Sequence, residues 1–319
     1  KRFVVDSVDH PKQPPVRPIS PKTPVLFVSG FSKDADRNAF VKALETAPEG
    51  VRDLFIEQRG FEPDGNYILP AFLQYDNEVD LPELECAYRN SPQVLGFVFR
   101  EKGMGEEYIE PALKLSARYG RYVSTLQVER DMMLRSVLSE QFYPLMKEYG
   151  DYFLPQNKMN NRRDQLPKVL AEMGAYLTER VGNWGIETEW GYAWKPMSWV
   201  RKSKPEMITT PLNWMPTLVL GLSGGASLYR VEGFCNPKYC HAFHRGEPRR
   251  FGPLWERGLG PLFEDIVKYD LIPTREQVRE KAKVAVATEP EHALHRAGSP
   301  ESLFPPGKIL AALHGFPIE

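Results

Sequence analysis

Short apolar runs alternate with amphipathic segments along most of the chain. Eight of these runs have the length and the β-branched or aromatic content typical of buried strands. They are residues 24–30, 52–58, 68–74, 94–99, 121–126, 152–154, 184–187 and 226–230. Because most of them precede a segment with apolar residues at helical spacing, the pattern predicts strands and helices in alternation.

The predicted helices fill the intervals between these strands. They are residues 36–46, 81–90, 106–119, 131–149, 165–180, 211–222 and 253–269, and the second strand has no clear helix after it. Several end at glycines typical of helix C-caps, namely Gly120, Gly150, Gly182 and the pair Gly224 and Gly225. Strand–helix alternation indicates a parallel sheet, and eight such units over about 250 residues are typical of a (β/α)8 barrel. We therefore expect an α/β protein with a TIM-barrel fold.

The main alternative is an open, doubly wound parallel sheet. Such a sheet commonly carries a glycine-rich phosphate loop after its first strand, where this chain reads SGFSKD. A GxxxxGK[ST] loop is also missing from the sequence. The barrel is therefore the better interpretation.

The pattern changes toward both ends of the chain. Thr274 and Gln277 form a capping box for a short helix over 275–282, and 283–287 read as a strand before a tail rich in Pro and His. The N-terminal residues are rich in proline. We expect a catalytic barrel over residues 17–272, with 1–16 and 273–319 meeting beside it in a small terminal annex.

Composition and charge narrow the classes of partner. The 319 residues are 42% apolar and 26% charged, as in an ordinary globular protein. Lys and Arg number 41 against 42 Asp and Glu, and this net charge of −1 argues against nucleic acid or an anionic membrane as partner. The longest uncharged run, 208–229, is broken by prolines and a glycine pair, so we expect no membrane helix. We expect a monomer.

Cysteine usage gives little sign of a disulfide framework or a metal. There are three cysteines, Cys86, Cys235 and Cys240. Cys235 and Cys240 are candidates for a disulfide or, with the adjacent His241, for a zinc site. The spacing does not suit structural zinc, and we expect neither a metal nor an organic cofactor. Cys86 lies in a predicted helix, where we expect it to be part of the core.

Carboxylates and amides follow several of the predicted strands. In a (β/α)8 barrel the active site lies at the C-terminal ends of the strands. The residues at these ends are Arg100 and Glu101 after the fourth strand, Gln156 and Asn157 after the sixth, Glu187 and Glu189 at the seventh, and Glu232 after the eighth. Carboxylates that face each other across a cleft are what glycosidic hydrolysis requires, because one must donate a proton while another activates water or attacks directly.

Aromatic residues gather beside the seventh strand. Trp184, Trp190, Tyr192 and Trp194 lie within a few positions of Glu187. Indole and phenol faces stack on sugar rings while their polar atoms reach hydroxyl groups, so the cluster favours a glycan-binding surface. A tryptophan-rich patch of the core is the alternative interpretation.

Several stretches of the chain resemble one known family. Residues 95–103 (LGFVFREKG), 112–122 (ALKLSARYGRY), 152–157 (YFLPQN), 182–199 (GNWGIETEWGYAWKPMSW) and 228–237 (LYRVEGFCNP) are similar to the catalytic barrel of glycoside hydrolase family 98. The likeness extends, in order, over about residues 17–287. The resemblance implies an inverting endo-β-glycosidase without a cofactor. Its substrate would be a galactose-containing glycan or xylan, and its location secreted, at the cell surface or periplasmic.

The resemblance also implies roles for individual residues. Glu101 would be the general acid, and Glu187 together with Glu232 would handle the water. From their places near the strand ends and in the aromatic cluster, we expect the sugars to be held by Arg100, Gln156, Asn157, Trp184, Glu189, Trp190, Tyr192, Trp194 and Tyr229.

Two departures from the family pattern qualify this assignment. The resemblance implies aspartate at the position of Glu187, so either Glu187 or Glu189 would carry the base. The family usually adds a β-sandwich after the barrel, and we interpret the annex as a remnant of one. A carbohydrate-binding barrel that has lost turnover is the alternative function.

Overall fold

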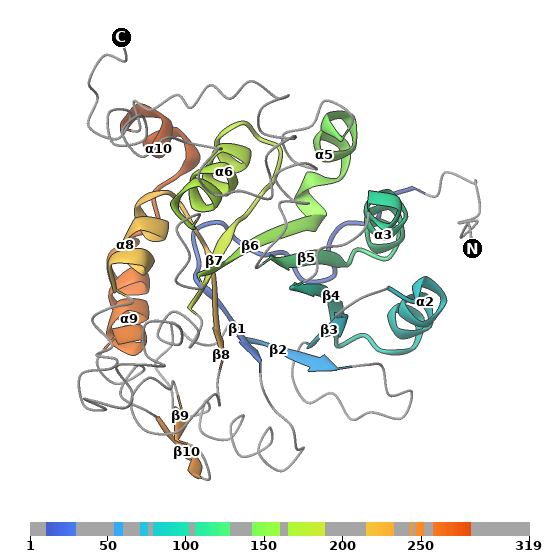
Figure 1. Cartoon of the computed structure of the whole chain (residues 1–319), viewed down its shortest axis with the longest axis horizontal. Helices are drawn as coiled ribbons and strands as arrows, with labels where there is room; N and C mark the ends of the chain where they lie inside the picture. The colour runs from blue at the N-terminus through green and yellow to red at the C-terminus, as the bar shows by residue number, and fades with distance from the viewer. Residues whose placement is uncertain are drawn as a thin grey trace, which may run out of the picture.

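The chain folds as a closed barrel of eight parallel strands in the computed structural model (Figure 1). The structure describes residues 11–29, 54–59, 71–75, 79–101, 106–127, 142–159, 165–188, 215–232, 243–244, 247–251 and 258–281. The strands are β1 (Val25–Ser29), β2 (Leu54–Arg59), β3 (Ala71–Tyr75), β4 (Val94–Glu101), β5 (Tyr122–Gln127), β6 (Phe153–Met159), β7 (Gly185–Thr188) and β8 (Leu228–Glu232). Because β1 pairs with both β2 and β8, the sheet has no free edge. The predicted (β/α)8 barrel is confirmed.

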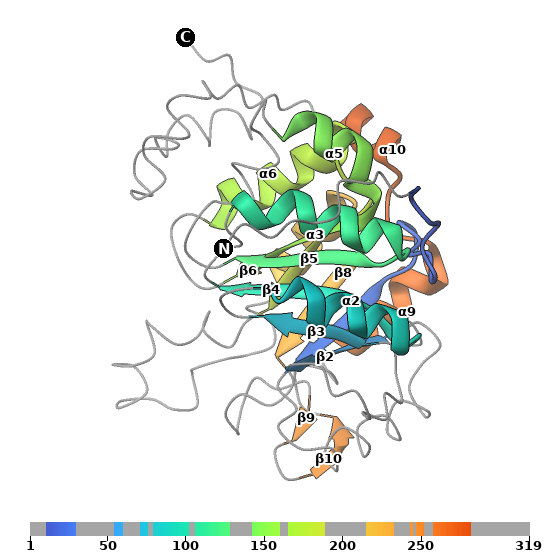
Figure 2. The same ribbon diagram turned by 90° about the vertical axis from the view of Figure 1, so that its right-hand side faces the viewer.

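Helices surround the strands. In Figure 1, α2 (Leu81–Asn90) and α3 (Glu106–Arg118) lie on the right, and α5 (Tyr143–Tyr149) and α6 (Gln165–Leu177) lie above. On the left lie α8 (Met215–Ser223) and α9 (Gly260–Tyr269), followed by α10 (Arg275–Lys281). A two-stranded antiparallel sheet of β9 (Phe243–His244) and β10 (Glu247–Phe251) stands below the barrel in Figures 1 and 2. The predicted helix 36–46 and strand 283–287 lie outside the described residues. None of the described helices combines the length and apolarity of a membrane span.

At three of the predicted C-cap glycines, the backbone conformation or a close neighbour explains why glycine is required. Gly120 and Gly225 have φ angles of +62° and +83°, which side chains rarely adopt. Gly150 differs, because it has a φ of −61° and continues into the short 3-10 helix η2 (Gly150–Tyr152). A Cβ on Gly150 would lie 1.9 Å from the carbonyl oxygen of Arg180, so glycine is needed there for close approach.

Strand residues alternate between the inside of the barrel and the layer beneath the helices. The inside holds an apolar cluster made of Val25, Phe27, Phe72, Leu95, Val98, Tyr122, Leu154 and Leu228. In five of the strands, the inward-facing positions nearer the C-terminal end are occupied by buried polar residues. We call these the interior polar layer: Gln74, Ser124, Gln156, Glu187 and Arg230. The barrel is therefore filled by apolar side chains below and by polar ones nearer the end where active sites lie.

Residues 11–23, here called the N-terminal strap, close the opposite end of the barrel. The Tyr122 hydroxyl donates to the Arg17 carbonyl oxygen at 3.0 Å and accepts from the Ile19 amide at 3.2 Å. Asn183 Nδ2 donates to the Ile19 carbonyl oxygen at 3.3 Å, and the Ile19 side chain packs on the interior apolar cluster. The strap is thus bonded to residues at the starts of β5 and β7.

The strap also contacts the segment that precedes α10. Lys22 Nζ lies 3.0 Å from Asp270 Oδ1 and donates to the Ile272 carbonyl oxygen. The predicted capping box is confirmed, because the Thr274 amide donates to Gln277 Oε1 at 2.8 Å and the Gln277 amide donates to Thr274 Oγ1 at 3.2 Å. Most of the predicted annex lies outside the described residues, so its boundaries stay a prediction.

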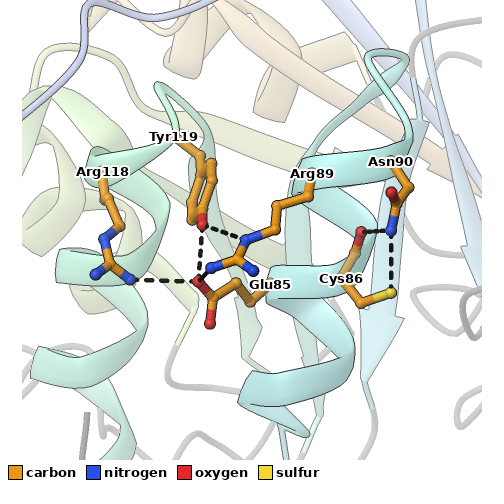
Figure 3. A network of polar contacts seen from close by, with 6 residues as sticks. All are labelled: Glu85, Cys86, Arg89, Asn90, Arg118 and Tyr119. Atoms are coloured by element: carbon orange, nitrogen blue, oxygen red, sulfur yellow. Dashed lines mark hydrogen bonds and ion pairs between the residues drawn. The ribbon is translucent and has the colours of Figure 1, made fainter. Parts of the chain in front are cut away.

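A polar network joins α2 to α3 on the outer surface (Figure 3). Glu85 Oε1 accepts from Arg89 Nη2 at 2.6 Å, from the Tyr119 hydroxyl at 2.7 Å and from Arg118 Nη1 at 3.3 Å. Burial raises the pKa of Glu85, but the Tyr119 hydrogen bond and the two guanidinium groups outweigh it, so the net pKa is lowered.

The same view corrects the prediction that Cys86 is part of the core. Cys86 is exposed, and Asn90 Nδ2 lies 3.2 Å from its Sγ atom (Figure 3). The buried positions of α2 are Leu81, Leu84, Ala87 and Tyr88, which follow helical spacing and leave position 86 outside that face.

Candidate active site

Three glutamates occupy the C-terminal ends of barrel strands. Glu101 is the last residue of β4 and pairs with Gln127 of β5. Glu187 is the penultimate residue of β7, and Glu232 ends β8 beside Ser29 of β1. All strands are parallel, so the three backbone positions share one end of the barrel. The side chains of Glu101 and Glu232 lie outside the described part of the structure.

Glu187 forms a buried ion pair with Arg230. Glu187 Oε1 lies 2.8 Å from Arg230 Nη1, and both side chains are 0% exposed. The two residues face each other in the register of β7 and β8. A guanidinium at this distance favours the ionised carboxylate, which is the form that a general base requires.

Arg230 was not among the residues predicted for the site. The sequence nevertheless carried a signal, because Arg230 is a cation in the predicted strand 226–230 and stands two positions before Glu232. Buried charges in proteins are paired or bound to metals, so such a cation indicates an anion nearby.

Gln156 lies inside the barrel, in the interior polar layer. It is 1% exposed, and its Nε2 donates to Ser124 Oγ at 2.9 Å. Ser124 Oγ in turn donates to the Leu154 carbonyl oxygen at 2.8 Å. The amide predicted to bind sugar is therefore bonded to β5 and belongs to the interior polar layer.

Trp184 and Tyr229, both predicted to bind sugar, are fully buried beneath the helices. Trp184 Nε1 donates to the Gly224 carbonyl oxygen at 3.2 Å. Tyr229 packs edge-on against Phe263 of α9, with ring centroids 5.2 Å apart, and its hydroxyl donates to the Ala226 carbonyl oxygen. Burial also raises the pKa of Tyr229. Both side chains contribute to packing, and the structure does not bring them to the barrel mouth.

The remaining predicted residues are described in part or not at all. Arg100 and Asn157 have a described backbone in β4 and β6, whereas their side chains lie outside the description. Glu189, Trp190, Tyr192 and Trp194 lie wholly outside it, as do Cys235, Cys240 and His241. Within the described ranges, no group of three or more His, Cys, Asp or Glu residues is placed to hold a metal ion.

A cavity of about 600 Å³ lies at the other end of the barrel, beside the N-terminal strap. It is lined by Tyr122, Tyr152 and Asn183 together with strap prolines and residues 274–276. The three named side chains already bond the strap, through the Arg17, Gln13 and Ile19 carbonyl oxygens respectively. The cavity therefore belongs to the closure of the barrel rather than to its mouth.

Comparisons with known proteins agree with this architecture. The model of glycosyl hydrolase family 98 matches residues 65–272. Among solved structures, the chain is similar to the catalytic module of a family 98 glycoside hydrolase from Streptococcus pneumoniae TIGR4. That module was solved with the LewisY pentasaccharide blood group antigen (TM-score 0.65), with the H-disaccharide blood group antigen (0.64) and in its native form (0.63).

These structural likenesses are distant in sequence. Each is 16% identical and covers 86% of this chain and 56% of that chain, so they support the fold. This chain thus spans little more than half the length of the streptococcal module. No curated protein sequence matches the chain. Because the family model covers more than half of its residues, the chain belongs to glycosyl hydrolase family 98.

Proposed function

We propose that the protein is an endo-acting glycoside hydrolase that cleaves internal β-glycosidic bonds of a neutral glycan with inversion. The observation that carries the proposal is family membership over residues 65–272, combined with three glutamates at the C-terminal ends of β4, β7 and β8. A net charge of −1 suits an uncharged glycan, either galactose-containing or xylan. The blood group antigens bound by the streptococcal modules favour the galactose-containing class.

Each glutamate has a separate role in the proposed reaction. Glu101 protonates the leaving oxygen, Glu187 removes a proton from water, and Glu232 orients that water. Inversion requires the acid and the base to stand about 6.5–9.5 Å apart, so that a water molecule fits between the base and the sugar. The ion pair with Arg230 supports the base assignment, because a base must begin the reaction ionised.

Sugar binding falls to residues around the mouth. We assign it to Arg100, Asn157, Glu189, Trp190, Tyr192 and Trp194. Gln156 supports this surface from the interior polar layer. Because long glycans are encountered mainly outside cells, we propose a secreted, cell-surface or periplasmic location.

The direct test is Glu101→Gln, assayed by new reducing ends on a panel of galactose-containing glycans and xylans. Loss of a general acid typically costs about 10²–10⁴-fold in rate, while glycan binding should persist. Glu85→Gln is the matched control, because Glu85 lies in the surface network of α2 and should leave turnover unchanged. Full activity of Glu101→Gln would contradict the acid assignment, and proton NMR of the first product distinguishes inversion from retention or elimination.

A second candidate function is glycan binding without turnover. The observation in its favour is that Glu187 is 0% exposed and held by Arg230, a geometry that also suits a purely structural pair. Binding to the glycan panel without new reducing ends would favour this second function.

A further inference from the structure

We infer that Arg230 is a positioning residue for the reaction, and that it acts through Glu187 by fixing where the carboxylate of the base lies. This inference rests on the proposed function, in which Glu187 activates the water. Arg230 contacts the Glu187 carboxylate at 2.8 Å, and we assign its effect on the reaction to this contact.

The spacing of β7 and β8 gives the pair its geometry. Gly185 stands two residues before Glu187, and Leu228 stands two residues before Arg230, in the same register. A Cβ on Gly185 would lie 2.3 Å from the Leu228 Cβ, so only glycine allows the strands to approach so closely here. This approach sets the distance over which Glu187 and Arg230 meet, at 2.8 Å.

The contact with Arg230 limits where the Glu187 carboxylate can lie. A shift of about 1 Å in a catalytic group can cost about 100-fold in rate. The contact draws the Glu187 side chain toward β8, the strand that ends at Glu232. Arg230 thereby holds the Glu187 carboxylate toward Glu232, the second carboxylate assigned to the base.

The charged and polar positions next to this pair follow from the strand register. On β6 the register partner of Glu187 is Lys158, and on β8 the next position of the same parity after Arg230 is Glu232. The register partner of Arg230 on β1 is Phe27, which is apolar. Elsewhere the interior polar layer is neutral, with Gln74, Ser124 and Gln156. Among the described side chains, Arg230 Nη1 lies 2.8 Å from the Glu187 carboxylate.

Two variants separate positioning from a merely structural role. Arg230→Met removes the charge and keeps much of the bulk, whereas Arg230→Lys keeps a charge but loses the planar fork of the guanidinium. The matched control is Arg279→Met, which removes an exposed arginine from its ion pair with Glu179 on the surface. Folding of each variant is checked by circular dichroism and thermal melting.

The first readout is the pH profile of kcat/KM on the glycan that the wild type cleaves best. Arg230→Met should move the acidic limb upward by about one to three pH units, because an opposite charge normally lowers the apparent pKa of a carboxyl by that amount. Arg230→Met should also reduce kcat by about 100-fold or more, with a smaller change in KM. Arg230→Lys should recover part of the lost kcat and part of the shift in the acidic limb. A folded Arg230→Met protein with an unchanged profile and unchanged kcat would overturn the inference.

The second readout does not depend on turnover. In protein labelled with ¹³C-glutamate, the NMR signal of the Glu187 side-chain carboxyl carbon is the one that disappears in Glu187→Gln. The pH titration of this signal is then followed in the wild type and in each Arg230 variant. A midpoint that rises in Arg230→Met, or by a smaller amount in Arg230→Lys, supports the inference, and an unchanged midpoint in a folded variant overturns it. If Arg230→Met does not fold, the titration of Arg230→Lys decides alone. Failure of the proposed function would appear differently, as no cleavage of any glycan by the wild type.

Discussion

Replacing Trp184 by phenylalanine tests whether this indole belongs to the core or to the glycan surface. The structure buries Trp184 completely, with its Nε1 donating to the Gly224 carbonyl oxygen. Phenylalanine cannot make this bond, and a buried acceptor left unsatisfied costs about 1–3 kcal/mol. The space left by the smaller ring costs about 1 kcal/mol more. We therefore expect the free energy of unfolding to fall by about 2–4 kcal/mol.

Thermal melting and glycan hydrolysis should be measured on the same Trp184→Phe protein. At about 2–4 °C of Tm per kcal/mol, the expected loss is roughly 4–16 °C. KM at a temperature where the variant is folded should stay close to that of the wild type. Tyr269→Phe is the control, because Tyr269 is 58% exposed and its change should leave Tm nearly unaltered. A wild-type Tm together with a raised KM would refute this reasoning and place the indole against the sugar.

Two further predictions concern glycine contacts and acid stability. Gly185→Ala should destabilise the barrel by about 1–3 kcal/mol or more, because the new methyl group collides with Leu228. In Gly174→Ala, in α6, the methyl group meets nothing within 4 Å, so this variant should be more stable by about 0.5–1 kcal/mol. Denaturant unfolding measures both free energies, and equal effects of the two substitutions would contradict the prediction. Glu85→Gln should cost at most about 1 kcal/mol at pH 7. Because the pKa of Glu85 is lowered by the fold, its contribution is present above the unfolded pKa and is lost as pH falls through the folded one. The difference in stability from the wild type should therefore begin to shrink as pH falls below the unfolded pKa of about 4.3 and should disappear below the folded pKa. A difference that stays constant down to acid unfolding would exclude the charge of Glu85 as its source.

The eight strands were predictable because buried parallel strands carry nearly continuous apolar runs. Each apolar run, bounded by glycines, prolines or polar residues, was long enough for one strand. Most segments between successive runs were long enough for one helix. The three glutamates were predictable for the same reason, since the end of a strand can be located to within a residue or two. Closure of β1 on β8 was predicted only through the count of eight units, because the two strands lie about 200 positions apart and no local signal joins them.

The side on which a residue lies was harder to predict. Trp184 and Glu187 are three positions apart and so occupy opposite faces, as strict alternation would have indicated. Because the two residues are close in the sequence, Trp184 was instead predicted to lie on the same glycan-binding surface as Glu187. Cys86 was misplaced because the buried face of α2 is set by Leu81, Leu84, Ala87 and Tyr88, and position 86 lies outside it although it is next to Ala87 in the sequence. Arg230 was missed because its partner lies on a different strand and 43 positions away.

The N-terminal strap has a consequence for how the chain reaches its native state. Lys22 is bonded to the Ile272 carbonyl oxygen, a contact that spans 250 positions. On a ribosome the strap is made early, yet its last anchor is synthesised some 250 residues later. The contacts of Lys22 can therefore form only after residues 270–272 have been synthesised, and we expect the strap to complete its docking late. Contacts of such long range slow folding, so an altered strap should lengthen the time during which the apolar interior is exposed to chaperones and to aggregation.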